Sequence, residues 1–439
     1  MNQPTGEPAQ TASMRSLMTD LFPLCRSITG DGVRQTLQRI QAEIPISVHE
    51  VPTGTPVLDW TVPEEWNVRS AWIKDPSGHT IVDLTDSTLH LMSYSEPIRA
   101  RMSLSELKEH LHSLPDRPTS IPYVTSYYRR NWGFCLRHDL LETLVDDGEY
   151  EVLIDSDFTQ GSLTYGELVV PGSTGEEILI TTHICHPSMA NDNLSGIAVV
   201  CELAKLVAAS PRRLTFRFLF IPGTIGSITW LATHPAEVEH VKGGVVVTGV
   251  GDLGDPCWKR PRADHTAIDR VARNILVSRG HHRIMEFYPY GYDERQFCSP
   301  GFDLAVGRFG RQVHGEYPEY HTSADDLSFV HDASMTGSLR ILSSIVDGID
   351  SNLTYVNLAP YGEPQLGRRD LYRNVGGAVD RRSAEMAVLW MLSLSDGTND
   401  VEAISTRSGI DMATLAAAAD RLTGAGLLGL AADSAAAPR

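Results

Sequence analysis

The sequence lacks the features that would place it in a membrane or in an oxidising compartment. Its polar first residues contain no apolar segment of the kind found in signal peptides. No apolar run approaches the roughly 20 residues that a membrane-spanning helix needs. The six cysteines are scattered, without the paired spacing of a disulfide framework. We therefore expect a cytoplasmic protein that does not use a membrane as a partner.

Positive charge is also scarce. The 439 residues include 37 lysines and arginines against 55 aspartates and glutamates, which gives a formal charge of −18. Such a chain repels phosphate backbones, so we expect no nucleic acid among its partners. Hydrophobic residues make up 42% of the chain, as in an ordinary globular protein, and the length is too great for a single core.

Several widespread catalytic motifs are missing as well. The chain contains no His-Glu-x-x-His, no paired Cys-x-x-Cys, no Gly-x-Ser-x-Gly and no phosphate-binding loop of the Gly-x-x-x-x-Gly-Lys-Ser/Thr type. A metal site in this protein therefore has to be assembled from residues that are far apart in the sequence.

Strands alternate with helices from residue 176 to residue 345, which predicts a doubly wound, mostly parallel α/β sheet. The segment 194–208 is apolar nearly all round, as in a buried helix. Helical spacing over 13–44, interrupted at Gly30-Asp31-Gly32, predicts two N-terminal helices. A capping box at Ser103 predicts a helix over 102–114, and residues 150–172 are typical of paired strands.

Two further units are expected beside this sheet. Short alternating segments and a turn at Asp75-Pro76-Ser77-Gly78 predict a small β-rich unit. Three helical stretches, separated at Asp396-Gly397 and at Gly409, predict a winged helix. The predicted domains are an α/β domain over 14–50 and 120–355, an inserted β-rich unit over 51–119 and a winged helix over 361–435.

Two clusters of metal-type side chains follow predicted strands. The first comes directly after a buried strand and contains His183, Cys185, His186 and Asp192. The second contains Asp293, Glu294, His321 and the acidic pair Asp325-Asp326. Ligands in open α/β sheets bind beyond the carboxyl ends of strands. Histidine and carboxylate from both clusters suit zinc, whose nitrogen and oxygen ligands lie about 2.0–2.2 Å away and whose catalytic sites keep one position for water.

Four longer motifs resemble a known family: THICHPSMANDNLSG, IPGTIGSITWL, GYDERQFCSPGFDL and EYHTSADDL. They are similar to the zinc aminopeptidase-like proteins of the peptidase M28 superfamily. More closely, nearly the whole chain resembles the bacterial DUF4910 branch, with an inserted DUF2172 unit and a C-terminal winged helix. The resemblance implies a fold of the zinc-aminopeptidase type and a site for one or two zinc ions.

The resemblance also implies which residues hold the metal. The implied ligands are His183, with His186 as the alternative, then Asp192 as the bridging aspartate, Asp293 and His321. Other M28 enzymes have an aspartate two residues after the first histidine, where it orients that ligand. This chain has Cys185 there, so the outer contacts of the metal site are changed.

One position departs further from the family pattern. After the corresponding strand, M28 enzymes carry two adjacent glutamates, a general base and a metal ligand, and the closer branch carries one. This chain has Gly223 instead. Loss of a positioned general base typically lowers the rate by about 10²–10⁴-fold. Three alternatives follow: Glu294 or Glu319 replaces the base, the enzyme uses a single metal, or hydrolysis is lost.

We therefore expect a zinc-dependent hydrolase that acts on an amide or peptide bond of a small peptide or aminoacyl metabolite. Arg295 is a candidate substrate contact, because arginine binds carboxylates bidentately, although a salt bridge to Asp293 or Glu294 is equally open. Tyr290 and Tyr292 either line a pocket or pack on the sheet. The alternative function is a binding or scaffolding protein that keeps the metal site without catalysis. A homo-oligomer is compatible with both.

The winged helix is not expected to bind DNA, although its fold leaves a DNA-binding regulator as a further possibility. Between Asp380 and Leu430 the basic residues are Arg381, Arg382, Arg407 and Arg421, and acidic residues outnumber them. Neutralisation of phosphates supplies nearly all non-specific affinity. The segment 412–422 is rich in alanine, so we expect it to pack against the catalytic domain or a second subunit.

A mobility-shift assay at low salt tests this expectation. The full-length protein should leave a random DNA duplex unshifted. Sub-micromolar binding that disappears when residues 361–439 are deleted would contradict it.

Overall fold

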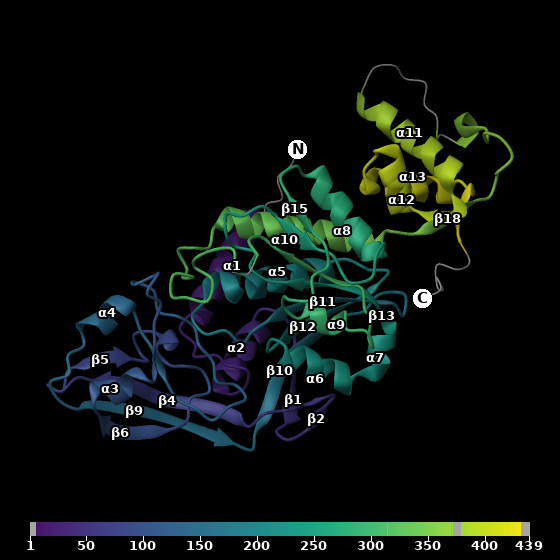
Figure 1. The fold of residues 1–439 in the computed structure, drawn as a ribbon. Coiled ribbons are helices and arrows are strands. Elements are labelled where there is room, and N and C mark those ends of the chain that lie inside the picture. Colours follow the sequence, from purple (N-terminus) through teal and green to yellow (C-terminus); the bar gives the residue numbers. More distant parts are fainter. Residues whose placement is uncertain (1–5, 314, 370, 372–378, 432–439) are drawn as a thin grey trace. The chain divides into compact units, whose positions relative to one another are not determined.

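The computed structural model describes residues 6–313, 315–369, 371 and 379–431, and Figure 1 shows its fold. The elements form two compact units. The first comprises the described residues up to Asp264 together with His281–Ile341, and the second comprises His265–Gly280 with the described residues from Leu342 onward. Among the residues just given, no helix combines the length and apolar character needed to cross a membrane.

An eight-stranded mixed sheet forms the centre of the first unit (Figure 1). Its strands, in spatial order, are β1 (Ser47–Pro52), β10 (Ser162–Val170), β12 (Thr215–Ile221), β11 (Glu177–His183), β13 (Val241–Val247), β16 (Val306–Gly310), β14 (Cys257–Lys259) and β15 (Arg283–Met285). The four from β12 to β16 are parallel, and β11 and β12 are buried along their whole length. Strands covered on both faces need apolar side chains at successive positions. The mostly parallel α/β sheet predicted from the sequence is confirmed.

Helices on either side of this sheet position its central strands. They are α1 (Glu7–Leu21), α2 (Asp31–Gln41), α5 (Gly196–Ala208), α6 (Ile225–Thr233), α7 (Pro235–His240), α9 (Glu294–Phe297) and α10 (Asp332–Asp350). The two helices predicted over 13–44 are confirmed as α1 and α2. Gly30 separates them with φ +93°, and a Cβ there would lie 2.2 Å from the carbonyl oxygen of Trp66. Only glycine fits this position.

A smaller antiparallel sheet lies in the same unit. Its order is β5 (Thr80–Asp83), β4 (Glu65–Lys74), β9 (Tyr150–Thr159) and β6 (Ile98–Met102). The β4–β5 hairpin closes at the predicted turn, where Gly78 N donates to Asp75 O at 2.9 Å. The pairing expected within residues 150–172 is different: β9 pairs with β4 and β6, whereas β10 pairs with β1 and β12. The chain thus passes from the smaller sheet to the larger one between β9 and β10. The predicted domain boundaries stay a prediction.

The remaining short elements connect these sheets. They are β2 (Pro56–Val57), β3 (Trp60–Thr61), η1 (Thr88–His90), α3 (Leu104–Lys108), β7 (Leu111–His112), β8 (Phe134–Cys135) and α4 (His138–Thr143). The helix expected over 102–114 is shorter than predicted, because residues 111–112 pair with β8 instead. Its capping box is confirmed: Glu106 N donates to Ser103 Oγ, and Ser103 N donates to Glu106 Oε2.

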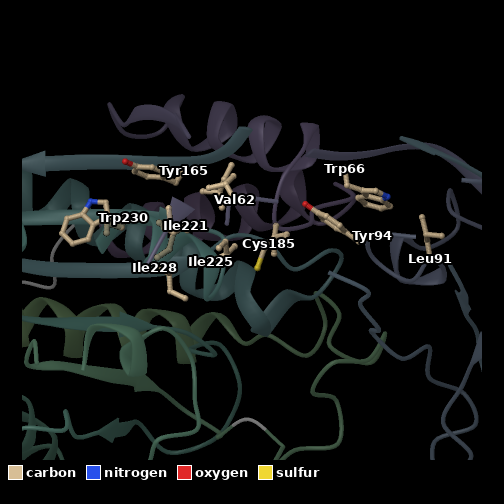
Figure 2. Packing of buried hydrophobic residues seen from close by; sticks show 14 of the residues in the cluster. Val62, Trp66, Leu91, Tyr94, Tyr165, Cys185, Ile221, Ile225, Ile228 and Trp230 are labelled. Atoms are coloured by element: carbon tan, nitrogen blue, oxygen red, sulfur yellow. The ribbon is translucent and has the colours of Figure 1, made fainter. Parts of the chain in front are cut away.

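One hydrophobic cluster joins the two sheets of the first unit. Trp66 and Tyr94 from the region of the smaller sheet and Tyr165 and Ile221 from the larger one belong to it. Figure 2 shows the Cys185 sulfur among these side chains, and Cys185 follows the end of β11 by two residues. The core therefore reaches the edge of the sheet where the two predicted clusters meet.

The second unit contains α8 (Ala267–Ser278), the end of α10 and a winged helix. The winged helix consists of β17 (Thr354–Asn357), α11 (Val379–Leu394), β18 (Asp396–Asp400), α12 (Val401–Ser408), α13 (Met412–Gly424) and β19 (Leu428–Leu430). The three strands form an antiparallel sheet in the order β18-β17-β19. The predicted winged helix is confirmed, and β17 shows that its sheet begins before residue 361.

The alanine-rich face of α13 is used within the winged helix itself. Leu415, Ala418 and Ala419 are buried, and α13 contacts α11 and α12. The expectation that this face packs against the catalytic domain or a second subunit is therefore wrong. At the start of α12, Arg270 of α8 donates to Glu402 Oε2 at 2.7 Å and also pairs with Asp400.

The ion pair between Arg34 and Glu65 joins α2 to β4. Arg34 Nη1 and Nη2 donate to Glu65 Oε1 and Oε2 at 2.6 and 2.7 Å, and Ser162 N donates to Oε2 at 3.0 Å. These hydrogen bonds, against an opposing effect of burial, lower the pKa of Glu65 to about 2. The carboxylate is thus stabilised in its charged form.

Replacement Glu65→Gln should lower the free energy of unfolding by about 1–3 kcal/mol at pH 7, because it removes charged hydrogen bonds. The folded pKa lies below the ordinary value of 4.5. The contribution is therefore present above about pH 4.5 and is lost as pH falls towards 2. Denaturant unfolding of both proteins at pH 7 and pH 3 measures it. Glu64→Gln, in an exposed ion pair, is the control, and an equal difference at both pH values would contradict the account.

Candidate metal centre

The last residue of β11 begins the candidate site. All seven residues of β11 are buried, and Ile184 N still donates to Ile221 O at 2.9 Å beyond its end. The chain then enters η2 (Ala190–Ser195), a fully buried turn whose backbone is non-helical at Asp192 and Asn193 and which leads into α5. This turn carries Asp192, so the strand and the helix that follows it fix His183 and Asp192 relative to each other.

The carboxylate of Asp192 faces three histidine side chains. Its Oδ1 lies 3.0 Å from His183 Nε2 and 3.6 Å from His186 Nδ1, while its Oδ2 lies 3.1 Å from His321 Nε2. The structure thus brings together residues of both predicted clusters. A carboxylate with one oxygen toward each set of imidazoles is placed to bridge two cations or to anchor one.

The donor atoms at this point fit a cation. The ligand atoms of His183, His186 and Asp192 all lie within 4.8 Å of one another, and no other such group of three is found in the described part of the chain. Asp192 Oδ1 is buried and accepts no hydrogen bond, although His183 Nε2 is 3.0 Å away. Imidazole nitrogen and carboxylate oxygen are the donors that zinc prefers.

Burial and the charges of neighbouring side chains determine whether each donor is protonated. Burial lowers the pKa of His186 to about 4 against the opposing charge of Asp192. The imidazole is therefore neutral at pH 7, as metal binding requires. Burial alone would raise the pKa of Asp192, but the interactions with His186, His183 and His321 hold it well below its ordinary value. The carboxylate is ionised.

Asp325 fixes the turn that carries Asp192, a role that the sequence did not reveal. Its Oδ1 and Oδ2 accept from Asn191 N at 2.6 Å and from Asp192 N at 2.9 Å, and its carbonyl oxygen accepts from Ala190 N at 2.9 Å. Burial raises the pKa of Asp325 to about 8 despite these hydrogen bonds. The acidic pair Asp325-Asp326, shortly after His321, is the feature of the sequence that points to this role.

Tyrosine rings surround the histidines. Tyr292 stacks on His183 with ring centroids 5.4 Å apart, and Tyr320 stacks on His321 at 3.9 Å. Tyr123 lies edge-on to His186 and to His321, at 5.2 Å from each. These rings pack against the imidazoles and restrict their orientation. Tyr292 was a candidate for a pocket wall, whereas Tyr123 carried no sequence signal.

Asp293 lies outside the converging group. Its Oδ1 accepts from Thr224 N at 2.6 Å and from Ser227 Oγ at 2.9 Å, which fixes the start of α6. Burial raises the pKa of Asp293, and the charge of His183 opposes this shift, so the two side chains influence each other. Its role as a metal ligand stays a prediction.

The two candidate bases have different surroundings. Glu294 is fully buried and accepts a 2.7 Å hydrogen bond from Lys259 Nζ, which also donates to the carbonyl oxygen of Tyr290 at 2.9 Å. This pairing counts against Glu294 as a free general base. Glu319 lies two residues before His321, and its carbonyl oxygen accepts from Thr322. Arg295 forms no salt bridge with Asp293 or Glu294 within the described ranges.

Gly223 faces the first histidine. A Cβ at this position would lie 3.8 Å from His183 Cβ and 3.5 Å from Cys185 Sγ, both ordinary contact distances. Gly223 N donates to the Cys185 thiol at 3.2 Å. Burial raises the pKa of Cys185 to about 12, so the thiol stays protonated and belongs to the core of Figure 2. A Cβ therefore fits at the position where the family pattern has an acid.

Residues 15–352 match the family described as domain of unknown function DUF4910, and residues 353–429 match a winged helix-turn-helix. The chain belongs to the DUF4910 family. A Clostridium acetobutylicum protein is 45% identical to it over 408 residues, which cover 93% of this chain and 94% of that protein. Its name assigns it provisionally to polysaccharide biosynthesis, with an aminopeptidase-like domain.

Solved structures show the same fold. A crystal structure from Clostridium acetobutylicum, provisionally described as a peptidase, matches this DUF4910 protein with a TM-score of 0.91 at 42% identity over 97% of each chain. BSAP, a zinc aminopeptidase from Bacillus subtilis, gives a TM-score of 0.57 at 12% identity and covers 79% of this chain and 95% of its own. A peptidase M28 precursor from Shewanella amazonensis gives 0.52 at 13%, with 78% and 97% covered. The predicted fold family is confirmed.

Removal of the shared carboxylate should weaken metal binding. Loss even of an outer contact typically costs 10–100-fold in affinity, so Asp192→Asn should weaken zinc binding by at least about tenfold. His265→Ala, which changes an exposed histidine of the second unit, should leave it unchanged. Competition with a zinc chelator gives both affinities. Equal zinc in the wild type and in an Asp192→Asn/His321→Ala double variant would show that the site is misplaced.

Proposed function

We propose that this DUF4910 protein is a zinc-dependent hydrolase of an amide or peptide bond in a small peptide or aminoacyl metabolite. The observation that carries the proposal is the carboxylate of Asp192, which faces His183 and His186 with one oxygen and His321 with the other. The likeness in fold to zinc aminopeptidases and the aminopeptidase-like domain named in a 45% identical relative support it.

The residues of the site have distinct tasks in this proposal. His183 or His186, Asp192 and His321 would hold one or two zinc ions, with Asp293 as a further candidate. A bound zinc ion polarises a carbonyl group and lowers the pKa of a water molecule. Tyr123 and Tyr292 pack against His186 and His183, and Asp325 holds the Asp192 turn.

The proton released in hydrolysis needs an acceptor from this chain. Glu294 is engaged by Lys259, which leaves Glu319 beside His321 as the remaining candidate of the two. A general base has to reach the water within hydrogen-bond distance, and such contacts often form only when substrate is bound.

A second candidate function, binding without catalysis, is favoured by Gly223. The family pattern places an acid at this position, next to His183, and the glycine supplies none. A protein of this kind keeps the donors of the site and binds the metal and a ligand without turnover.

Hydrolysis of aminoacyl p-nitroanilides and dipeptides, measured with and without added zinc, separates the two functions. Zinc-dependent turnover that is abolished by Asp192→Asn supports the hydrolase. Full zinc occupancy with no turnover of any compound supports the binding protein.

Restoring an acid at position 223 should raise activity or metal content. Gly223→Glu places a carboxylate beside His183, and a positioned base is worth about 10²–10⁴-fold in rate. Gly223→Ala is the matched control, because it adds the Cβ without the acid. Unchanged activity and unchanged zinc stoichiometry in Gly223→Glu would contradict the account, as would a fully active wild type with two zinc ions.

A further inference from the structure

A small cavity with charged walls lies in the first unit. It has a volume of about 200 Å³, and its lining includes Lys259 of β14, Tyr290, Glu294 of α9 and Arg308 of β16. Lys259 and Arg308 lie directly opposite each other on neighbouring antiparallel strands. Like charges in such a pair repel each other, so each cation needs a counter-charge.

Lys259 has its counter-charge within the chain, whereas Arg308 forms no salt bridge with any described residue. The Lys259 ammonium is 2.7 Å from Glu294 Oε1, and both side chains are buried. Arg308 is 2% exposed, and its Nε and Nη2 are buried without a hydrogen-bond partner. A buried cation without a partner is strongly unfavourable. The cavity is therefore suited to an anion that comes from outside the chain.

The two open donors of Arg308 lie on the edge of the guanidinium that matches a carboxylate. Arg217 of the same sheet uses this edge for Glu177: its Nε and Nη2 donate to the two carboxylate oxygens at 2.7 and 3.0 Å. Parallel bonds of this kind recognise groups that present two oxygens, such as carboxylates and phosphates. The Lys259–Glu294 pair is neutral, and Glu316, which also lines the cavity, pairs with Arg283. Arg308 therefore leaves one positive charge, which suits a monoanionic carboxylate better than a phosphate dianion.

Tyr292 connects this cavity to the candidate metal centre. Its ring stacks on His183 at 5.4 Å, and the Arg308 guanidinium carbon lies 5.6 Å from the same ring centroid. A group bound at Arg308 is thus one aromatic ring away from the donors of the metal site. This separation allows one part of a small substrate to contact Arg308 while another part lies at the donors of the metal site.

We propose that Arg308 binds a carboxylate of the substrate in the cavity beside the metal centre. This substrate class rests on the proposed hydrolase function, whereas carboxylate binding by the cavity does not. Glu294 Oε2 is also buried without a partner, so the cavity favours a carboxylate that carries a hydroxyl or N–H donor next to it.

Calorimetric titration of chelator-treated protein at constant ionic strength tests the proposal without the metal. Acetate should bind with a dissociation constant on the order of millimolar, glycolate should bind more tightly through its hydroxyl, and neutral acetamide should not bind. Absence of acetate and glycolate binding overturns the proposal. Tighter binding of inorganic phosphate than of acetate overturns the assignment to a carboxylate.

Variants of Arg308 locate the binding. Arg308→Gln should weaken acetate binding by at least about tenfold, and Arg308→Lys should weaken it similarly, because lysine keeps the charge without the bidentate edge. Arg69→Gln, an exposed arginine paired with Asp155, is the control and should bind as the wild type does. Acetate should raise the melting temperature of the wild type and leave that of Arg308→Gln unchanged. An Arg308→Lys protein that binds acetate as well as the wild type overturns the proposal.

The same titration separates this proposal from the hydrolase. A protein that hydrolyses nothing yet binds acetate through Arg308 refutes the hydrolase and supports the carboxylate site. An active hydrolase whose chelator-treated form binds no carboxylate supports the hydrolase and refutes the carboxylate site.

Discussion

The buried carboxylate of Asp192 is the charge on which the rest of the first unit depends. It has no exposure to solvent, and an isolated charge in that position would be strongly unfavourable. Three imidazoles face its two oxygens, and Asp325 holds the turn that presents it. Each of these partners comes from a segment placed by the central sheet, so the sheet and the site depend on each other.

The same sheet places the second charged region next to the first. Arg308 and Lys259 sit on β16 and β14, while the tyrosine that separates them from His183 belongs to the loop before α9. Tyr292 thus contacts both Arg308 and His183. In the proposed hydrolase, a substrate would meet the metal donors at one end and the bidentate edge of Arg308 at the other, with the ring of Tyr292 between them.

Much of this could be predicted because local sequence and structure agree. The apolar run before His183 predicts a buried strand, and a site is expected where such a strand ends. Pairings between distant segments could not be predicted in the same way. The sequence of residues 150–172 suits a hairpin as well as two strands in different sheets, and only the presence of β4 and β1 decides. The Lys259 partner of Glu294 is 35 residues away, on β14. The sequence therefore does not indicate that the Glu294 carboxylate is paired. Asp325 was visible as an acidic residue, but its contacts to the Asp192 turn depend on the complete fold.

The position of a metal ion relative to Asp192 tests the central claim most directly. Anomalous diffraction from a zinc-soaked crystal locates the ion independently of any activity. The account predicts a peak about 2.0–2.2 Å from an oxygen of Asp192 and from a nitrogen of His183, His186 or His321. Zinc peaks elsewhere on the protein, with none in contact with Asp192, would contradict it.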